Sequence, residues 1–536
     1  MGKNFLKSSL QNASFNIIFQ VGFRVVTFLL NAFVLRNISQ AVIGVMNVRL
    51  LLLESTILFL SREAFRRACL SKTTEHNWPQ VINLLWLTVP LCAVQCILFG
   101  WIWLYVLSAP GPEITTHYAL GVWSICISCI LAMCVEPLCL VSQAFLFVKL
   151  RVLIETFSVS IRTITFTCLV LWKPSAAVVA FSIAQIIAQI CYALAYCFYF
   201  HNYLQQRKDM PSSPDDFPFK SLKDFLPKKL PGQAPVDWKL CILTWSFLKQ
   251  GILKQILTEG ERYVMTLFAV LTFYEQGIYD VVNNLGSLAA RFLFRPIEES
   301  AYFYFSQLVY RDKQINEQNS IQMAEAAFVL KGLLKCVTSL GIIVVCFGQG
   351  YSRLLLMFYG GSALSDSLAT LLLRTHCFAV LLLALNGTTE CYALATMNAN
   401  QIDRYNHIMA YLSASFLLIS WLLTTLFGSV GFIIANCCNM AARIIHSVRF
   451  IHKRYEGTEF KPLKGIIPSP LFLIMVLISG LVTLLSEYMY YESSKVIHLG
   501  IGVVLFSMTL SVWYYEESDL VTIGYRKYRR RSIKME

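Results

Sequence analysis

Apolar runs long enough to cross a lipid bilayer recur along the whole chain, and they limit the possible fold more than any other feature. A membrane-spanning helix needs about 20 mostly apolar residues, and its backbone groups must pair within the helix. Charged residues make up 14% of the chain, against about a quarter in soluble domains. The sequence therefore predicts an all-α polytopic membrane protein with about fourteen transmembrane helices. The runs lie near 15–35, 42–60, 81–107, 119–143, 152–172, 177–200, 240–270, 277–308, 323–347, 367–397, 407–427, 429–448, 468–488 and 496–515.

The distribution of Lys and Arg predicts the orientation of these helices. If the N-terminus is cytosolic, the dense basic clusters fall on the cytosolic side, including Arg62/Arg66/Arg67 and the tail 526–534. The opposite side then keeps only Arg36, Lys173, Arg353 and Lys495. Because cytosolic loops carry an excess of Lys and Arg, we expect both termini in the cytosol. The net charge of +14 is then explained by topology and by attraction to anionic lipid, and we expect no nucleic-acid binding.

A Pro- and Lys-rich stretch at 201–238 divides the runs into six before it and eight after it. This composition is typical of a linker. We expect a six-helix lobe at 1–200, a cytosolic linker at 201–238, a second six-helix lobe at 239–455, two appended helices at 456–516 and a basic cytosolic tail at 517–536. All loops on the far side are short, and the longest is expected near 348–366, so no catalytic domain fits there.

The eighth run, 277–308, carries polar residues at helical spacing. Asp280, Asn283, Asn284, Ser287, Arg291, Arg295 and Glu298 recur on one helical face. An ionisable group in hydrocarbon costs roughly 2.5–3.5 kcal/mol, so such groups usually face a bundle interior or a wet cavity. Arg291 and Arg295 are i, i+4 neighbours and can offer two guanidinium groups to one anion such as a phosphate. Pro296 predicts a kink at this point.

Three other runs carry similar polar faces: the first with Arg24, the second with Glu54 and nearby Arg49, and the seventh with Gln250, Lys254 and Glu261. These four runs are the first two of each presumed half, so we expect them to converge on one hydrated cavity. The predicted lining is Arg24, Arg49, Glu54, Lys254, Glu261, Asp280, Asn284, Arg291, Arg295 and Glu298. The alternative is that these charges pair to hold helices together, Glu54 with Arg49 or Arg24, and Glu261 or Glu298 with Lys254 or Arg291. Arg374 and Glu390 of the tenth run form a further candidate pair.

Signatures of catalysis are missing from the sequence. It has no Gly-rich loop ending in Lys-Ser/Thr, so we expect no ATP-driven pump, no enzyme activity and no cofactor. Most of the 17 cysteines lie within apolar runs, where Cys acts as a small apolar residue. Cys126 and Cys129 have the spacing of metal ligands but no second pair follows them, so we expect no metal site.

Several stretches resemble one known family: GVMNVRL (44–50), SREAFRRAC (61–69), TWSFLKQ (244–250), LTEGERY (257–263), YDVVNN (279–284), RPIEES (295–300) and DRYN (403–406). Together they are similar to the Rft family of endoplasmic-reticulum membrane proteins, over residues from about 12 to 515. The resemblance implies the fold of the multidrug/oligosaccharidyl-lipid/polysaccharide exporter superfamily, with two six-helix lobes in a V around a central cavity. It also implies a role in N-glycosylation, where the family is proposed to flip a dolichyl-diphosphate heptasaccharide from the cytosolic to the luminal leaflet. That glycan has five mannoses and two N-acetylglucosamines.

Three functions remain open at this stage. A flippase would use Arg24, Arg291 and Arg295 to neutralise the diphosphate, while Gln250, Asn283 and Asn284 hydrogen-bond sugars. A second possibility is an accessory protein that binds or scaffolds the same lipid-linked oligosaccharide without flipping it. A third is a drug or cation exporter of the same superfamily, whose cavity would need a dominant acidic residue.

Overall fold

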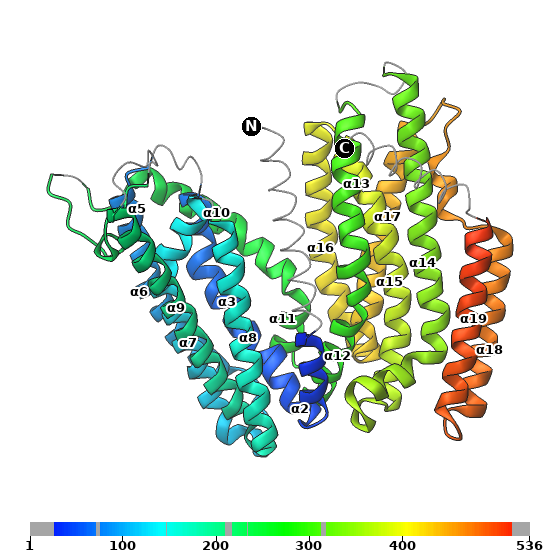
Figure 1. Cartoon of the computed structure of the whole chain (residues 1–536), viewed down its shortest axis with the longest axis horizontal. Helices are drawn as coiled ribbons and strands as arrows, with labels where there is room; N and C mark the ends of the chain where they lie inside the picture. Colours follow the sequence, from blue (N-terminus) through cyan, green and yellow to red (C-terminus); the bar gives the residue numbers. More distant parts are fainter. Residues whose placement is uncertain are drawn as a thin grey trace. The chain divides into compact units, whose positions relative to one another are not determined.

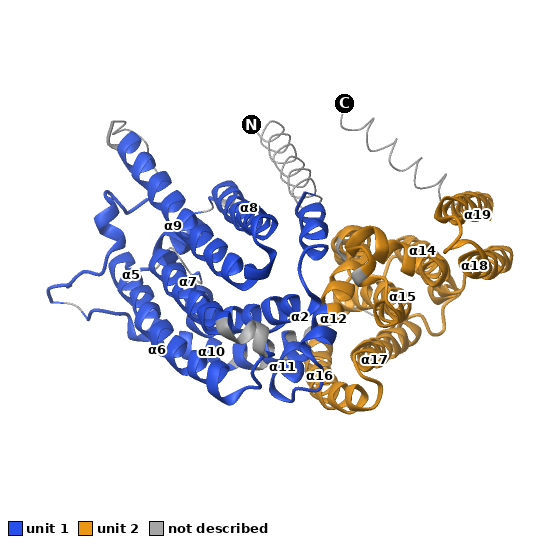
Figure 2. Ribbon diagram, turned by 90° about the horizontal axis from the view of Figure 1, so that it is seen from below, with its two compact units in different colours: residues 1–277 blue, residues 278–536 orange. Residues whose placement is uncertain are grey.

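The computed structural model of the chain describes residues 26–70, 76–145, 147–209, 217–232, 234–311 and 318–516. Within these ranges the regular structure is entirely helical, which confirms the predicted all-α class. The helices form two compact units, residues 1–277 and 278–536, which are coloured separately in Figure 2.

Ten helical segments are long and apolar enough to cross a membrane, so the chain is a multi-pass membrane protein. They are Gln40–Cys69, Trp78–Val106, His117–Ala144, Lys149–Trp172, Pro174–Arg207, Ser320–Gly360, Ser367–Thr396, Asn400–Phe427, Pro462–Tyr490 and Lys495–Glu516. The first, seventh, eighth and twelfth runs are helical in their described parts but are shorter, interrupted or more polar. The total of fourteen spans therefore stays a prediction.

Unit 1 contains the first seven runs and the start of the eighth. Its elements are α2 (Gln40–Ile43), η1 (Gly44–Leu50), α3 (Leu51–Leu58), η2 (Phe59–Glu63), α4 (Ala64–Cys69), α5 (Trp78–Trp86), α6 (Thr88–Trp101), η4 (Ile102–Val106), α7 (Pro112–Ala144), α8 (Val148–Trp172), η5 (Pro174–Ala176), α9 (Ala177–Asp209), η6 (Leu222–Phe225), α10 (Trp238–Thr258), α11 (Gly260–Leu267) and the first residues of α12 (Phe273–Gly286). Helix α7 packs against α6 and α9, and α9 also packs against α8.

The second span is one continuous helix with two π-helical segments, η1 and η2, separated by α3. A π turn holds more residues than an α turn, and such segments often occur at functional sites. Because the extra residue changes the direction of the side chains that follow, a face drawn at 3.6-residue spacing does not run straight through this span. The polar side chains of the second span therefore do not lie on the single straight face that regular helical spacing predicts.

The stretch expected to be a linker is partly folded onto unit 1. Helix α9 continues to Asp209, and the aromatic side chains of Phe217, Phe219 and Phe225 join the hydrophobic cluster at the end of α5 and α9. The indole Nε1 of Trp86 donates a hydrogen bond to the carbonyl oxygen of Phe225 over 2.7 Å. The described part of this stretch is thus a docked loop, which we call the α5 loop (residues 217–237 without 233).

The carboxyl group of Asp224 holds the turn of the α5 loop. Partial burial on its own would raise the pKa of Asp224. Hydrogen bonds from Lys228 Nζ, over 2.5 Å, and from two backbone N–H groups, over 2.8 Å each, outweigh burial and lower the pKa to about 2. This carboxylate is therefore charged throughout the physiological pH range.

The boundary between the two compact units lies between residues 277 and 278, whereas the second lobe is expected from the sequence to begin at 239. Residues 239–277 group with unit 1 because α10 packs against α4 and η2, and because α11 contacts η1. The start of α12 also lies against the second span at Gly44. The expected start of the second six-helix lobe at residue 239 stays a prediction.

Unit 2 consists of the rest of α12, η7 (Ala290–Phe294), α13 (Arg295–Leu308), α14 (Ser320–Gly360), η9 (Ser362–Leu364), α15 (Ser367–Thr396), α16 (Ala399–Phe427), α17 (Val430–Arg454), η10 (Pro462–Ile466), α18 (Pro470–Tyr490) and α19 (Lys495–Glu516). Helix α15 packs against α13, α14 and α17, and α18 packs against α14 and α19. Figure 1 shows α14, α15 and α17 side by side within this unit.

The loop expected near 348–366 is wrong, because α14 continues to Gly360. Gly348 and Gly350 lie within this helix, where they allow neighbouring helices to approach closely. A Cβ atom at Gly348 would lie 2.3 Å from Cys377 Sγ of α15, and one at Gly350 would lie 3.0 Å from backbone atoms of Thr483 in α18. The helix ends at Gly361, whose φ of +74° favours glycine.

Candidate functional site: ionic groups of the membrane-spanning helices

The ten predicted lining residues are spread over both units. Arg24 lies outside the described residues. Lys254 belongs to α10 and Arg291 to η7, but their side chains are not among those described. The other seven side chains can be placed, and each unit is considered separately.

Arg49 is sealed within unit 1. Its side chain is 0% exposed, Nη2 donates to Ser108 Oγ over 2.6 Å, and the guanidinium lies 5.1 Å from the centre of the Phe273 ring. Trp103 Nε1 donates to the backbone carbonyl oxygen of Arg49 over 3.0 Å. Among the described residues no carboxylate pairs with Arg49, and its Nε and Nη1 have no hydrogen-bond partner. The suggested Arg49–Glu54 pair is therefore wrong, and Arg49 lines no open cavity in this structure.

Glu54 is bound inside unit 1 by a chain of polar side chains. Gln185 Nε2 of α9 donates to Glu54 Oε1 over 2.8 Å, and Arg162 Nη1 of α8 donates to Gln185 Oε1 over 3.3 Å. The amide of Gln185 also reaches Ser128 Oγ over 3.3 Å. This chain links α3, α7, α8 and α9, so Glu54 holds the helices of unit 1 together. Arg162 and Gln185 were not predicted as part of a site, although both are polar residues within apolar runs.

The second span and the seventh run meet through polar side chains within unit 1, and their convergence with the first and eighth runs on one cavity stays a prediction. Ser55 Oγ of α3 donates to Glu259 Oε1 over 3.0 Å and accepts from Gln255 Nε2 over 3.0 Å. The hydroxyl group of the next residue, Thr56, lies 2.8 Å from that of Tyr263. The seventh run is interrupted at Glu259, between α10 and α11. The predicted residue Glu261 lies partly buried two positions further on, in α11.

The polar face predicted along 277–308 is divided into two helices. Asp280 and Asn284 belong to α12, where Asn284 Nδ2 donates to Asp280 Oδ2 over 3.0 Å. The π-helical segment η7 follows and contains Arg291, and α13 begins at Arg295. Pro296 is the second residue after η7, at a position where its missing N–H leaves the backbone bonding of the preceding turn irregular. A π segment thus lies just before Pro296, the kink predicted at Pro296 stays a prediction, and the polar face does not run straight.

Arg295 and Glu298 have different surroundings in unit 2. Arg295 Nε pairs with Glu299 Oε1 over 3.1 Å, and its side chain is 74% exposed within the structure. Glu298 is partly buried against α15, where a Cβ atom added at Gly387 would come within 1.7 Å of its Oε1. Within unit 2, Arg295 is therefore a described basic residue of this run whose side chain is exposed enough for a large anion to contact it.

The suggested Arg374–Glu390 pair is wrong. Arg374 Nη2 pairs with Glu487 Oε2 of α18 over 2.5 Å, and Arg443 Nη2 of α17 lies 3.5 Å from Glu390 Oε1. Glu390 also accepts hydrogen bonds from the hydroxyl of Tyr405 and from Asn386 Nδ2, the latter over 3.1 Å. Sixteen positions separate Arg374 from Glu390 on one helix, which at 1.5 Å per residue is about 24 Å. Each charge therefore pairs with a different helix.

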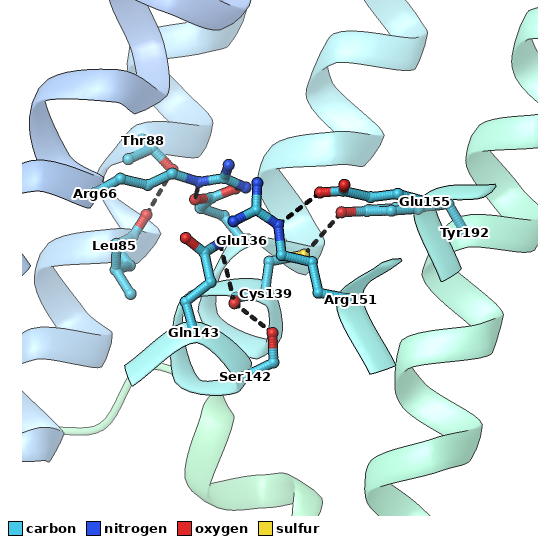
Figure 3. A network of polar contacts seen from close by, with 10 residues as sticks. All are labelled: Arg66, Leu85, Thr88, Glu136, Cys139, Ser142, Gln143, Arg151, Glu155 and Tyr192. Carbon is cyan, nitrogen blue, oxygen red and sulfur yellow. Dashed lines mark hydrogen bonds and ion pairs between the residues drawn. The ribbon is translucent and has the colours of Figure 1, made fainter. Parts of the chain in front are cut away.

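A further polar network, missed as a site by the sequence analysis, lies at the end of unit 1 that the charge pattern assigns to the cytosol (Figure 3). Arg66 of α4 binds Glu136 of α7 through two parallel contacts, of which Nη2 to Oε2 is 2.9 Å. Nearby, Arg151 Nε pairs with Glu155 Oε1 over 2.8 Å, and Cys139 Sγ lies 3.2 Å from the hydroxyl of Tyr192. Glu136 is buried, so this pair joins α4 to α7 inside the unit.

The chemistry of these groups is that of binding and packing. Within the described ranges, no group of three His, Cys, Asp or Glu side chains is arranged to hold a metal ion. Glu54, Glu136 and Glu390 are each engaged by Arg, Gln or Tyr side chains of another helix, while Arg49 is a buried cation with a serine and an aromatic ring as neighbours.

The fold defines a class of protein. The structure is similar to the lipid II flippase MurJ in an inward closed conformation, with a TM-score of 0.57 and 12% identity, over 95% of this chain and 99% of that one. It is also similar to an inward-facing multidrug resistance transporter of the MATE family, with a TM-score of 0.54 and 10% identity, over 80% and 95% of the two chains. The chain is a polytopic membrane protein with the fold of these transporters.

The sequence comparison identifies the family. The model of the Rft protein family matches residues 8–527. The Man(5)GlcNAc(2)-PP-dolichol translocation protein RFT1 of Xenopus tropicalis is 46% identical over 90% of this chain and 89% of its own length. The proteins of the same name from Drosophila melanogaster and Mus musculus are 44% and 43% identical, over 100% and 95% of this chain and 100% and 94% of theirs. The chain belongs to the Rft family, as the sequence resemblance predicts.

Proposed function

We propose that this chain flips a dolichyl-diphosphate-linked heptasaccharide from the cytosolic to the luminal leaflet of the endoplasmic-reticulum membrane, with both of its termini in the cytosol. The observation that carries the proposal is the shared name of relatives that align over at least 90% of the chain at 43–46% identity, Man(5)GlcNAc(2)-PP-dolichol translocation protein. The likeness of the fold to transporters is compatible with it. A role in N-glycosylation follows from that substrate.

The physical need for such a protein is clear from the substrate. Moving a diphosphate and a glycan through hydrocarbon leaves many polar groups unpaired, each costing roughly 2–7 kcal/mol. Spans that carry polar groups and irregular backbone can replace water along the path. The second, seventh and eighth runs have these properties, with π segments or a break at η1, η2, Glu259 and η7.

Within this proposal the diphosphate binds Arg295 together with Arg24 and Arg291. Arg295 is held by an exposed i, i+4 pair with Glu299, and such pairs contribute only about 0.3–0.5 kcal/mol. A diphosphate therefore displaces Glu299 from Arg295 at little cost. Asn283, Asn284 and Gln250 are proposed to hydrogen-bond the sugars, and Asp280 is proposed to orient Asn284 through their contact.

The test is reconstitution of the purified full-length protein into liposomes with a labelled dolichyl-diphosphate heptasaccharide, followed by leaflet-selective probing. The proposal expects faster exchange between leaflets than in protein-free vesicles. Arg295→Glu should remove this acceleration without lowering the amount of folded protein, and the matched variant Glu299→Gln should keep it. Acceleration by Arg295→Glu equal to wild type would contradict the role of the arginine.

A second candidate is an accessory protein that binds the same glycolipid without flipping it. The observation that favours it is the engagement of Glu54, Glu136 and Glu390 by partners within their own units, which is the arrangement of a packed helical scaffold. Saturable binding of the glycolipid by the wild-type protein, with no acceleration in liposomes, would support this candidate over the flippase.

A further inference from the structure

Unit 2 contains an apolar pocket of about 450 Å³ between α14, α15 and α19, closed at one side by the end of α12. We call it the α14 pocket. Its volume lies in the range of small-molecule sites. Two polar lining groups are turned toward backbone carbonyls and away from the space: Ser352 Oγ donates to Gly348 over 2.5 Å, and the Tyr351 hydroxyl donates to His498 over 2.6 Å. The wall is therefore almost entirely hydrocarbon and aromatic, with the His376 ring as its other polar group.

The α14 pocket is elongated along the helices. Its lining on α14 runs from Val344 to Leu355, which at 1.5 Å per residue is about 16 Å of helix axis. An apolar space of this length matches a stretch of extended hydrocarbon chain.

The open side of the α14 pocket faces the surface that the spans present to lipid. Val503 and Leu499 of α19 and Leu355 of α14 line the pocket, and all three are exposed apolar side chains on candidate membrane spans. Soluble protein surfaces seldom present such residues together, whereas lipid-facing surfaces do. A ligand therefore reaches the pocket from the hydrocarbon layer and not from water.

We propose that the α14 pocket holds a stretch of the polyisoprenoid tail of the lipid-linked oligosaccharide. This inference rests on the proposed function, which supplies a substrate whose tail is a dolichyl chain. Such a chain is far longer than the roughly 30 Å of hydrocarbon in a bilayer, so part of it must bend or lie against the protein. The pocket is an elongated, apolar, lipid-accessible slot in the unit that also carries Arg295, the proposed diphosphate contact.

The test uses photolabelling of the full-length protein in phosphatidylcholine nanodiscs. The probe is a long-chain polyprenyl phosphate with a diazirine on its terminal isoprene, and labelled peptides are mapped by mass spectrometry. Val503→Trp fills the pocket from the lipid side. Val504→Trp is the matched control, because Val504 is 60% exposed on the same helix, against 58% for Val503, and does not line the pocket. Expected labels lie in α14, α15 and α19, with a severalfold loss in Val503→Trp and none in Val504→Trp.

Two results would overturn the inference. One is labelling spread over α18 and α19 that both variants leave equal. The other is equal labelling of the α14 pocket by a diazirine on the acyl chain of phosphatidylcholine, which would make it a general lipid site. Neither result affects the proposed function, which is decided by the liposome assay with the complete glycolipid. Wild-type flipping combined with either result would separate the two proposals.

Discussion

The start of the second span and the start of α12 approach each other so closely that neither has room for a methyl group. A Cβ atom at Gly277 would lie 1.9 Å from the carbonyl oxygen of Gln40, and one at Gly44 would lie 2.1 Å from the carbonyl oxygen of Phe273. Ordinary contacts of a Cβ atom begin near 3.4 Å. Both obstacles are backbone atoms, so alanine at Gly277 must push the two helices apart by more than 1 Å.

Two opposing effects decide the stability of Gly277→Ala. Replacing a helical glycine by alanine is intrinsically favourable by about 0.8–1.0 kcal/mol. Overpacking a tight contact usually costs about 1–3 kcal/mol, and a fixed backbone oxygen places this case at the upper end. We therefore expect a net loss of about 2 kcal/mol. The matched control is Gly500→Ala in α19, where no atom lies within 4 Å of the added Cβ and only the favourable effect remains.

The measurement is the apparent melting temperature of the purified full-length protein in detergent, followed by fluorescence-detected size exclusion. Gly277→Ala should melt several degrees below wild type, while Gly500→Ala should melt at or above it. Gly387→Ala provides a second comparison, because its Cβ would meet only the movable carboxyl end of Glu298, and its loss should be smaller. If Gly277→Ala and Gly500→Ala melt together, the close contact at Gly277 does not exist in the protein.

Three further outcomes follow from described contacts. Because the pKa of Asp224 is about 2, below its unfolded value near 4, docking of the α5 loop should be full above pH 4 and weaken as pH falls from about 4 to about 2. Amide exchange of the loop, corrected for intrinsic rate, should show this, and Asp224→Asn should lose the pH dependence; an unchanged dependence would disprove the role of this carboxylate. Glu136→Gln leaves Arg66 buried without its counterion and should cost about 3–5 kcal/mol, lowering the melting temperature more than the double variant with Arg66→Gln. Equal losses in the single and double variants would argue against the pair. Trp86→Phe removes the hydrogen bond to Phe225, worth about 1 kcal/mol, and should speed proteolysis within the α5 loop, whereas unchanged cleavage would mean that the bond does not secure it.

The fold class was predictable because a helix that crosses the lipid must be apolar over about 20 residues, and this shows directly in the hydropathy of the sequence. The long apolar runs correspond to helices throughout the described residues, and the ten candidate spans confirm a multi-pass protein. The one clear failure was the loop near 348–366. Gly348 and Gly350 are turn residues in water, but inside a bundle they allow α15 and α18 to pack against α14. Local composition cannot distinguish these two uses of glycine.

Ion-pair partners were harder to predict than ionic residues. Arg374 and Glu390 were both correctly singled out as charges within a span, but Arg374 pairs with Glu487 and Glu390 with Arg443. The choice depends on which helices are neighbours and at what height, and a single sequence contains neither quantity. The second and seventh runs were expected to line one cavity, and the contact between them that the structure shows is made by Ser55 and Glu259. Each lies one or two positions from the predicted Glu54 and Glu261.

Such small displacements have a common physical origin in the backbone. One residue of an α-helix corresponds to about 100° of rotation, so a single extra residue in a turn changes the face to which all later side chains point. The second span contains two π segments, which carry Arg49 and Arg62, and the eighth run contains one, which carries Arg291. The hydropathy of a segment does not reveal whether its backbone forms α or π hydrogen bonds, because both kinds of helix contain the same apolar residue types in a membrane span. The ionic residues of these spans therefore owe their directions to backbone irregularities, and a face drawn at constant helical spacing places the right residues on the wrong side of the helix.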